Sequence, residues 1–272
     1  MEGKAGLVTG AASGIGRACA IRFAQEGAAV VVADLERARA GGEETVRAIE
    51  KAGASAAFFA CDVSNAEDSE ALVRHVVDRH GRLDYAHNNA GIGVHKLLAD
   101  TDDEDFDRVI AVNLRGTFLG MKHQIRQMLQ NGGGAIVNTS SNAGLRAVRL
   151  LSAYTASKHG INGLTKNAAV EYANDGIRVN CVCPGAIMTP LMSNESPERQ
   201  QQILRPQARP ASATRARWPP RSSGCAPTTP RSSPGSRCPW TPGRSPAGKR
   251  EYTARIGKKP GARRQGIPGA PR

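Results

Sequence analysis

The chain has 272 residues and a formal net charge of +13, a size that suits one α/β domain with a substantial core. The positive charge is confined to the last quarter: residues 1–204 carry 21 Lys and Arg against 23 Asp and Glu, whereas residues 205–272 carry 16 against one. The first 204 residues therefore lack the basic surface of a specific nucleic-acid binder, and no signal sequence or 18-residue apolar run indicates a secreted or membrane protein, so we expect a cytoplasmic protein.

Short apolar segments alternate with helix-periodic segments through residue 183. This alternation is typical of a parallel sheet with helices on both faces. The expected strands are Gly6–Thr9, Ala28–Ala33, Ala56–Ala60, Leu83–Asn88, Ala135–Thr139 and Ile177–Val182. Helices are expected over Ile15–Glu26, Asp102–Gln130 and Ala153–Asp175 and in the remaining gaps. The pattern predicts a Rossmann-like, doubly wound α/β fold in a single domain over residues 1–204.

A glycine-rich turn follows the first expected strand and opens a helix. It contains Gly10, Ser13, Gly14, Ile15 and Gly16, with the spacing G-x-x-x-G-x-G rather than G-x-G-x-x-G. Glycine lets the backbone turn sharply and approach a pyrophosphate, and the helix N-terminus offers free N–H groups. Such a turn alone is weak evidence, but its place between the first strand and the first helix predicts a dinucleotide site.

Asp34 ends the second expected strand, 18 residues after Gly16. An acid at this distance accepts hydrogen bonds from a ribose 2′-hydroxyl and repels a 2′-phosphate. Leu35 follows it, so no arginine is placed there to receive NADP. Arg17, directly after the last glycine, is expected on the solvated face of the helix. The predicted cofactor is NAD in preference to NADP.

Polar residues also follow the third and fourth expected strands. Asp62 and Val63 lie after the third, and Asn89 lies in the segment N-N-A-G after the fourth. Ligands of open α/β sheets bind at these carboxyl ends, so all three are candidate cofactor contacts. Taken alone, Asp62 could equally be a helix N-cap, and the asparagine pair could be turn chemistry.

Tyr154 and Lys158 are spaced i, i+4 on an expected helix and so lie on one face of it. A tyrosine with its ordinary pKa near 10 is a poor base, and a neighbouring ammonium group favours the phenolate. The same spacing also occurs in ordinary amphipathic helices. Two further residues support a site: Ser141 follows the fifth expected strand, and Asn113 lies inside an apolar helix, an awkward place for an amide.

These motifs together resemble the short-chain dehydrogenase/reductase family. The segments T-G-x-x-x-G-I-G, N-N-A-G, Y-x-x-x-K and Pro184-Gly185, with Asn113 and Ser141, occur in the family order and spacing over about residues 4–204. The resemblance implies reversible oxidation of a secondary alcohol to a ketone by hydride transfer with NAD. It also implies a homodimer or homotetramer when the C-terminal part is intact.

The resemblance also implies a role for each site residue. Tyr154 would be the general acid/base, and Lys158 would bind the nicotinamide ribose and lower the tyrosine pKa. Ser141 would donate a hydrogen bond to the substrate oxygen, and Asn113 would hold a relay water. Further implied cofactor contacts are Tyr154 itself, Asn89, Pro184, Gly185, Ile187 and Thr189.

The composition changes abruptly after about Leu204. Thirteen of the 16 prolines lie in residues 205–272, whose only Ile, Leu, Val or Phe residues are Ile256 and Ile267, so we expect this tail to be disordered. Family members of this length continue instead with a last helix and a seventh strand, which are missing here. Shifting the frame by one base over residues 217–241 in GC-rich codons permits V-A-A-A-V-V-W-L-C-S-D-D-A-S-F-V-T-G-x-A-L-P-V-D, which would suit that helix and strand. We therefore hypothesise that the tail is a frameshift product.

Other function classes remain as alternatives. A chain that ends in this tail is expected to be poorly folded or inactive, which leaves open a catalytically defective or non-enzymatic product of the same fold. The basic tail could also bind nucleic acid without specificity. The six cysteines show neither a disulfide framework nor metal-ligand spacing, so we expect reduced, structural thiols and no metal.

Overall fold

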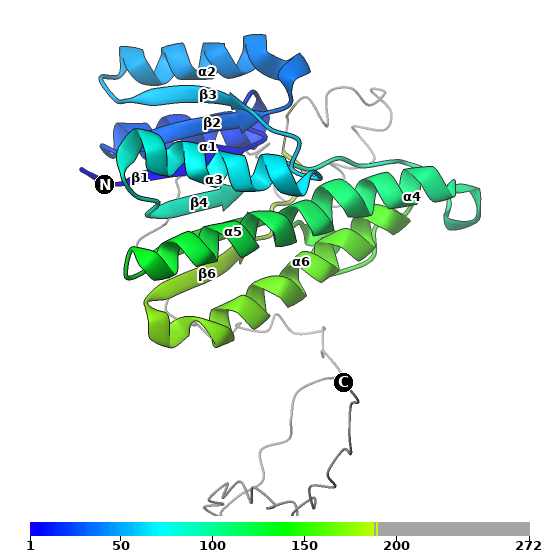
Figure 1. The fold of residues 1–272 in the computed structure, drawn as a ribbon. Coiled ribbons are helices and arrows are strands. Elements are labelled where there is room, and N and C mark those ends of the chain that lie inside the picture. Colours follow the sequence, from blue (N-terminus) through cyan, green and yellow to red (C-terminus); the bar gives the residue numbers. More distant parts are fainter. Residues whose placement is uncertain (188, 190–272) are drawn as a thin grey trace, which may run out of the picture. The chain divides into compact units, whose positions relative to one another are not determined.

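The computed structural model describes residues 1–187 and 189, which contain a six-stranded parallel sheet with helices on both faces (Figure 1). The strand order is β3-β2-β1-β4-β5-β6, and each neighbouring pair is parallel. The strands are β1 (Ala5–Thr9), β2 (Ala29–Asp34), β3 (Ala56–Ala60), β4 (Tyr85–Asn88), β5 (Gly134–Thr139) and β6 (Ile177–Val182). The predicted Rossmann-like fold is confirmed.

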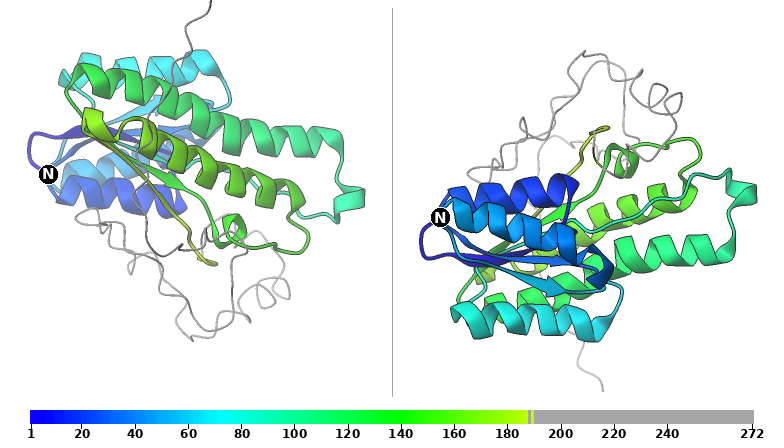
Figure 2. Two further views of the ribbon diagram at one scale, coloured as in Figure 1. Left: turned by 90° about the horizontal axis from the view of Figure 1, so that it is seen from below. Right: turned by 90° about the horizontal axis from the view of Figure 1, so that it is seen from above.

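Two helical layers cover the sheet, as the two views of Figure 2 show. The helices are α1 (Gly14–Gln25), α2 (Arg39–Lys51), α3 (Ala66–His80), α4 (Asp103–Val109), α5 (Gly116–Gln130) and α6 (Ser152–Glu171). One apolar core joins α1 and α2 to the sheet through Phe23 and Ile49. The other joins α3 and α5 to the opposite face through Val76 and Met128. Alternate strand residues enter opposite cores, as in Leu7 and Val8 of β1, because side chains of a strand alternate between its faces.

The strand order changes direction between β1 and β4, which are neighbours in the sheet. Strands β2 and β3 extend the sheet on one side of β1, and β5 and β6 extend it on the other side of β4. Ligands of open α/β sheets bind where the order reverses, outside the carboxyl ends of the strands. The segments that follow β1, β4 and β5 therefore define the region in which a site is expected.

The helix expected over Asp102–Gln130 is interrupted. Between α4 and α5 lies the π-helical turn η3 (Ile110–Arg115), which holds Asn113. Such turns inside α-helices are frequently found at functional sites. Helical periodicity alone predicts the two flanking segments but not the turn, because one extra residue barely changes the apolar pattern over so long a stretch.

The predictions of a disordered tail over residues 205–272 and of a missing last helix and seventh strand concern residues outside the described part. Within the described part, no helix is both long and apolar enough to cross a bilayer.

Candidate active site

The glycine-rich turn between β1 and α1 is packed too closely for larger residues. Gly10 and Gly14 have positive φ angles of 64° and 56°, in the left-handed region that favours glycine. A Cβ added to Gly16 would lie 2.2 Å from the Gly10 carbonyl oxygen, and one added to Gly10 would lie 2.9 Å from Cα of Ala90. Ser13 is the N-cap of α1, and its exposed side chain makes no capping hydrogen bond. This open helix N-terminus fits a pyrophosphate.

Asp34 is tied to the same turn. Its carboxylate accepts hydrogen bonds from the backbone N–H of Ala12 and of Leu35, both at 2.9 Å. Asp34 is half-buried, and the bond from Ala12 holds its carboxylate beside the turn, where an acid that binds a ribose would lie. The residues of the turn and Asp34 therefore fit a dinucleotide.

The expectation that Arg17 lies on a solvated helix face is wrong. Its side chain is only 23% exposed, and its guanidinium donates to the carbonyl oxygens of Ala12 at 2.5 Å and Gly41 at 3.0 Å and pairs with Glu44 at 2.8 Å. Arg17 therefore joins the turn to α2. The sequence could not show the contacts with α2, because Gly41 and Glu44 lie 24 and 27 positions away along the chain.

Asp62 does not cap a helix. The N-cap of α3 is Asn65, whose side chain accepts hydrogen bonds from the backbone of Glu67 and Asp68. Asp62 instead accepts from the backbone N–H and the hydroxyl of Ser64, at 2.9 and 2.7 Å. Its carboxylate is exposed, and half-buried Val63 follows it. A contact of either residue with an adenine stays a prediction.

Asn89 connects β4 to the glycine-rich turn. Its backbone N–H donates to the Thr9 hydroxyl at 2.9 Å. Its side-chain amide donates to the carbonyl oxygens of Thr9 at 3.1 Å and Gly10 at 3.3 Å. The side chain thus supports the turn, and a direct contact with the cofactor stays a prediction.

Tyr154 and Lys158 lie on α6 near the carboxyl end of β5. Lys158 is 2% exposed, and its ammonium donates to the Thr139 carbonyl oxygen at 2.8 Å and lies 5.3 Å from the centre of the Tyr154 ring. Burial lowers the pKa of Lys158 to about 8, and the charge of Cys183 opposes this lowering. Burial raises the pKa of Tyr154, and the Ser141 hydroxyl beside the phenol opposes this rise.

Ser141 follows β5 and faces the tyrosine. Its hydroxyl accepts a hydrogen bond from the Ala143 backbone at 3.1 Å and donates to the Asn142 side chain at 3.1 Å. Neighbouring Ser140 instead donates to the Lys158 carbonyl oxygen at 3.0 Å. Of the two serines, Ser141 is therefore the one beside the phenol, while Ser140 supports α6.

Asn113 is fully buried in η3, and its side chain holds the segment after β4. Its amide oxygen accepts from the Ile92 N–H at 2.8 Å, and its amide nitrogen donates to the Ile92 carbonyl at 2.9 Å and to the Ser157 hydroxyl at 3.1 Å. A Cβ added to Gly91 would lie 3.2 Å from the Asn113 amide oxygen and 3.4 Å from the Lys158 ammonium. Gly91 thus borders both side chains.

The segment after β6 reaches the same region. The Pro184 carbonyl oxygen accepts a hydrogen bond from the Asn142 backbone at 2.9 Å, next to Ser141. Gly185 is exposed, Ile187 is 8% exposed and Thr189 is half-buried. Their contact with a nicotinamide stays a prediction.

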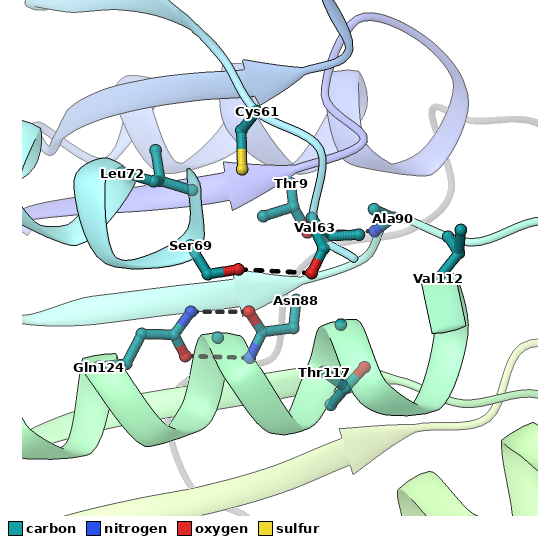
Figure 3. A pocket seen from close by; sticks show the side chains of 12 residues that line it. Thr9, Cys61, Val63, Ser69, Leu72, Asn88, Ala90, Val112, Thr117 and Gln124 are labelled. Atoms are coloured by element: carbon teal, nitrogen blue, oxygen red, sulfur yellow. Dashed lines mark hydrogen bonds between the residues drawn. The ribbon is translucent and has the colours of Figure 1, made fainter. Parts of the chain in front are cut away.

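A buried network of amides behind the site is absent from the sequence expectations. Asn88 and Gln124 exchange two hydrogen bonds, of 3.0 and 2.7 Å, beside a pocket with room for roughly one water molecule (Figure 3). Asn88 also donates to Asn138 at 2.9 Å, which donates to the Thr165 hydroxyl at 2.9 Å. The signal that could have predicted this network is a polar residue at a core-facing position in each of two adjacent strands, Asn88 opposite Asn138.

The described cysteines, Cys19, Cys61, Cys181 and Cys183, are free thiols. No cluster of three or more His, Cys, Asp or Glu residues in the described part of the chain could hold a metal ion.

Comparisons with known proteins agree with this geometry. The family model described as short chain dehydrogenase matches residues 4–200. A 3beta-hydroxysteroid dehydrogenase of Mediterraneibacter gnavus is 46% identical over 70% of this chain and 68% of its own length. A cyclohexanol dehydrogenase of an Acinetobacter species is 44% identical over 70% of this chain and 75% of its own. The crystal structure of levodione reductase superposes with a TM-score of 0.70 and 38% identity, covering 75% of this chain and 81% of that one.

Proposed function

Because the chain belongs to the short-chain dehydrogenase family, we propose that it transfers a hydride between NAD(H) and a secondary alcohol or ketone, with Tyr154 as the general acid/base. One observation carries this proposal. Tyr154, Lys158, Ser141 and Asn113 converge at the carboxyl ends of β4 and β5, beside the glycine-rich turn after β1.

The family uses nicotinamide cofactors, and for this chain we propose NAD rather than NADP. The pyrophosphate would be held by Gly10, Ser13, Gly14, Ile15 and Gly16. The Asp34 carboxylate, which the Ala12 N–H holds beside the turn, would accept hydrogen bonds from the ribose hydroxyls and repel a 2′-phosphate. Asp62, Val63, Asn89, Pro184, Gly185, Ile187 and Thr189 would supply the remaining contacts.

When bound, the cofactor supplies or accepts the hydride at its nicotinamide ring. The protein supplies the proton. In ketone reduction, the Tyr154 hydroxyl donates its proton to the substrate oxygen, and in alcohol oxidation the phenolate removes it. Ser141, beside the same phenol, would turn its hydroxyl hydrogen from the Asn142 side chain to the substrate oxygen and so polarise the carbonyl.

Lys158 stabilises the charge that develops on Tyr154. The buried phenol resists ionisation, and a cation held near its ring offsets this cost as the proton leaves. A lysine pKa of about 8 keeps most of this side chain charged near neutral pH. Lys158 would also bind the nicotinamide ribose, and Asn113 would hold the water that returns the proton from solvent.

For the substrate, we propose an alicyclic secondary alcohol or its ketone. The names of two relatives specify a 3beta-hydroxysteroid and cyclohexanol. In this chain, Leu145 is 68% exposed on the segment that follows Ser141, which offers an apolar contact for such a ring. For the assembly, we propose a homodimer or homotetramer through α5 and α6, which expose Phe118 and Val170.

The substitution Tyr154→Phe tests the acid/base role. It removes the phenolic hydroxyl alone, so we expect kcat for ketone reduction to fall about a thousandfold while the Kd for NADH stays within about twofold. Tyr172→Phe, at the end of the same helix, is the matched control and is expected to keep full activity. Retention of activity by Tyr154→Phe would contradict the proposal.

A further inference from the structure

His87 is a buried titratable group that the proposed chemistry does not use. It lies on β4 directly before Asn88, is 3% exposed and faces α1, where its ring meets the edge of Phe23 in a T-shaped contact. Burial lowers the pKa of His87 to about 4, so the imidazole is neutral at physiological pH. A neutral imidazole has one N–H donor and one bare nitrogen, and the neighbours determine which is which.

The hydrogen bonds around His87 select one tautomer. Its Nε2 lies 2.8 Å from the Thr139 hydroxyl, while its Nδ1 is buried without a partner in the described structure. The Thr139 hydroxyl has a single hydrogen, which it donates to the Asn89 side-chain oxygen at 3.3 Å. The hydroxyl must therefore accept from Nε2–H. The other tautomer would bury an N–H without an acceptor and leave the Asn89 oxygen without its donor.

The order of donors continues into the glycine-rich turn. Because the Asn89 side-chain oxygen accepts from Thr139, its amide nitrogen is directed at the carbonyl oxygens of Thr9 and Gly10. The fit there is tight: a Cβ on Gly16 would lie 2.7 Å from the Asn89 amide nitrogen. A reversed amide would place its oxygen against two carbonyl oxygens, so the orientation of Asn89 matters to the shape of the turn.

Thr139 also contacts the catalytic side of the site. Its backbone carbonyl oxygen accepts the hydrogen bond of the Lys158 ammonium at 2.8 Å. One residue therefore links the proposed cofactor turn, through its hydroxyl, with the proposed catalytic lysine, through its carbonyl. His87 is the donor that fixes this hydroxyl from the opposite side.

We propose that His87 is a positioning residue for the cofactor: its Nε2–H orients the Thr139 hydroxyl, which orients the Asn89 amide and thereby holds the glycine-rich turn in its binding conformation. This inference rests on the proposed function, because it assumes that the turn receives NAD(H). It assigns His87 no part in proton transfer, and its effect is on cofactor affinity rather than on the chemical step.

Two substitutions of the full-length chain separate this role from packing. Glutamine places an amide N–H at about the reach of Nε2, whereas leucine fills the volume and donates nothing. We expect His87→Leu to raise the Kd for NADH about tenfold, the loss typical of one buried hydrogen bond, and His87→Gln to stay within about twofold of the wild type. Thr139→Val should match His87→Leu, and combining both should add little further loss.

A stability control and a spectroscopic measurement complete the test. Thr165→Val removes a buried hydroxyl that bonds Asn138 on the other face of the sheet, so it should lower the thermal midpoint and leave the Kd for NADH unchanged. Nitrogen-15 NMR of the cofactor-free chain measures the ring nitrogens directly, and the resonances that disappear in His87→Gln are those of His87. These resonances should be those of a neutral ring protonated at Nε2. A ring protonated at Nδ1 would overturn the proposal.

The outcomes distinguish the two levels of inference. If circular dichroism shows that the wild-type chain is folded and it binds no NADH, the proposed function fails, and the cofactor role of His87 fails with it. If the wild type binds NADH and both His87→Leu and Thr139→Val bind equally well, the role of His87 alone is overturned. If His87→Leu does not fold, Thr139→Val gives the same decision.

Discussion

Asp34 is the side chain that we propose selects the cofactor. Its carboxylate is held by two backbone N–H groups, one of them from the glycine-rich turn, so its charge lies in a fixed position beside the expected ribose. If the Asp34 carboxylate moved aside to admit a 2′-phosphate, both of these hydrogen bonds would break. A fixed negative charge therefore opposes a 2′-phosphate more strongly than a mobile surface carboxylate would.

The substitution Asp34→Ser is predicted to relax this selection. Removing the charge should raise the ratio of kcat/KM for NADPH to that for NADH by about a hundredfold, since a close like-charge contact is worth several kcal/mol. Glu36→Gln is the control, because this exposed acid two positions later is paired with Arg39 and should leave the ratio unchanged. An unaltered ratio in Asp34→Ser would show that another residue selects the cofactor.

For single residues, the sequence predicts which side chains form the site better than it predicts which groups each side chain contacts. Tyr154, Ser141 and Lys158 could be named because fixed spacing and strand ends bring them together. The contacts of Arg17 with Gly41 and Glu44, and of His87 with Thr139, could not, because they depend on how helices and strands pack. The expectation of a lowered Tyr154 pKa is wrong: burial raises this pKa, and the group that opposes the rise is the Ser141 hydroxyl.

Among the elements, the turn between β1 and α1 depends most on individual residues. Gly16→Ala would place a methyl group 2.2 Å from the Gly10 carbonyl oxygen, so the turn must shift. We predict a loss of about 2 kcal/mol in the free energy of unfolding, typical of overpacking, together with weaker NADH binding. Urea denaturation and NADH titration measure the two effects.

Gly163→Ala is the matched control within α6. A Cβ at this position meets nothing within 4 Å, and the residue is exposed on a helix. It should stabilise the protein by about 0.5 to 1 kcal/mol, because alanine favours helix more than glycine does. Equal stabilities of the two variants would refute the tight packing of the turn.

The strands and most helices could be predicted because their apolar periodicity reflects burial on one or both faces. The six expected strands agree with β1 to β6 to within one or two residues at each end. The turn η3 could not be predicted, because its extra residue is accommodated by hydrogen bonds inside a continuous helix. The sequence offered only the awkward place of Asn113 as a hint.

For the whole molecule, the topology explains why distant segments form one site. Residues after β1, β4, β5 and β6 meet at one edge because all six strands are parallel and the order reverses between β1 and β4. We propose that residues 1–204 form the catalytic domain. The hypothesis of a frameshifted tail over residues 205–272 concerns residues outside the described part, and sequencing the coding DNA over codons 195–245 decides it.

The central claim is that this chain exchanges a hydride between NAD(H) and an alicyclic ketone or alcohol. The most direct measurement is the absorbance of NADH in the presence of the purified full-length chain and cyclohexanone, followed by the reverse reaction with NAD and cyclohexanol. Contrary to the expectation that residues 205–272 leave the chain inactive, the account predicts loss of NADH in the first reaction, formation of NADH in the second, and slower turnover with NADP(H). A folded chain that binds NADH but turns over neither substrate nor any other secondary alcohol or ketone would contradict it and favour a catalytically defective product of the same fold.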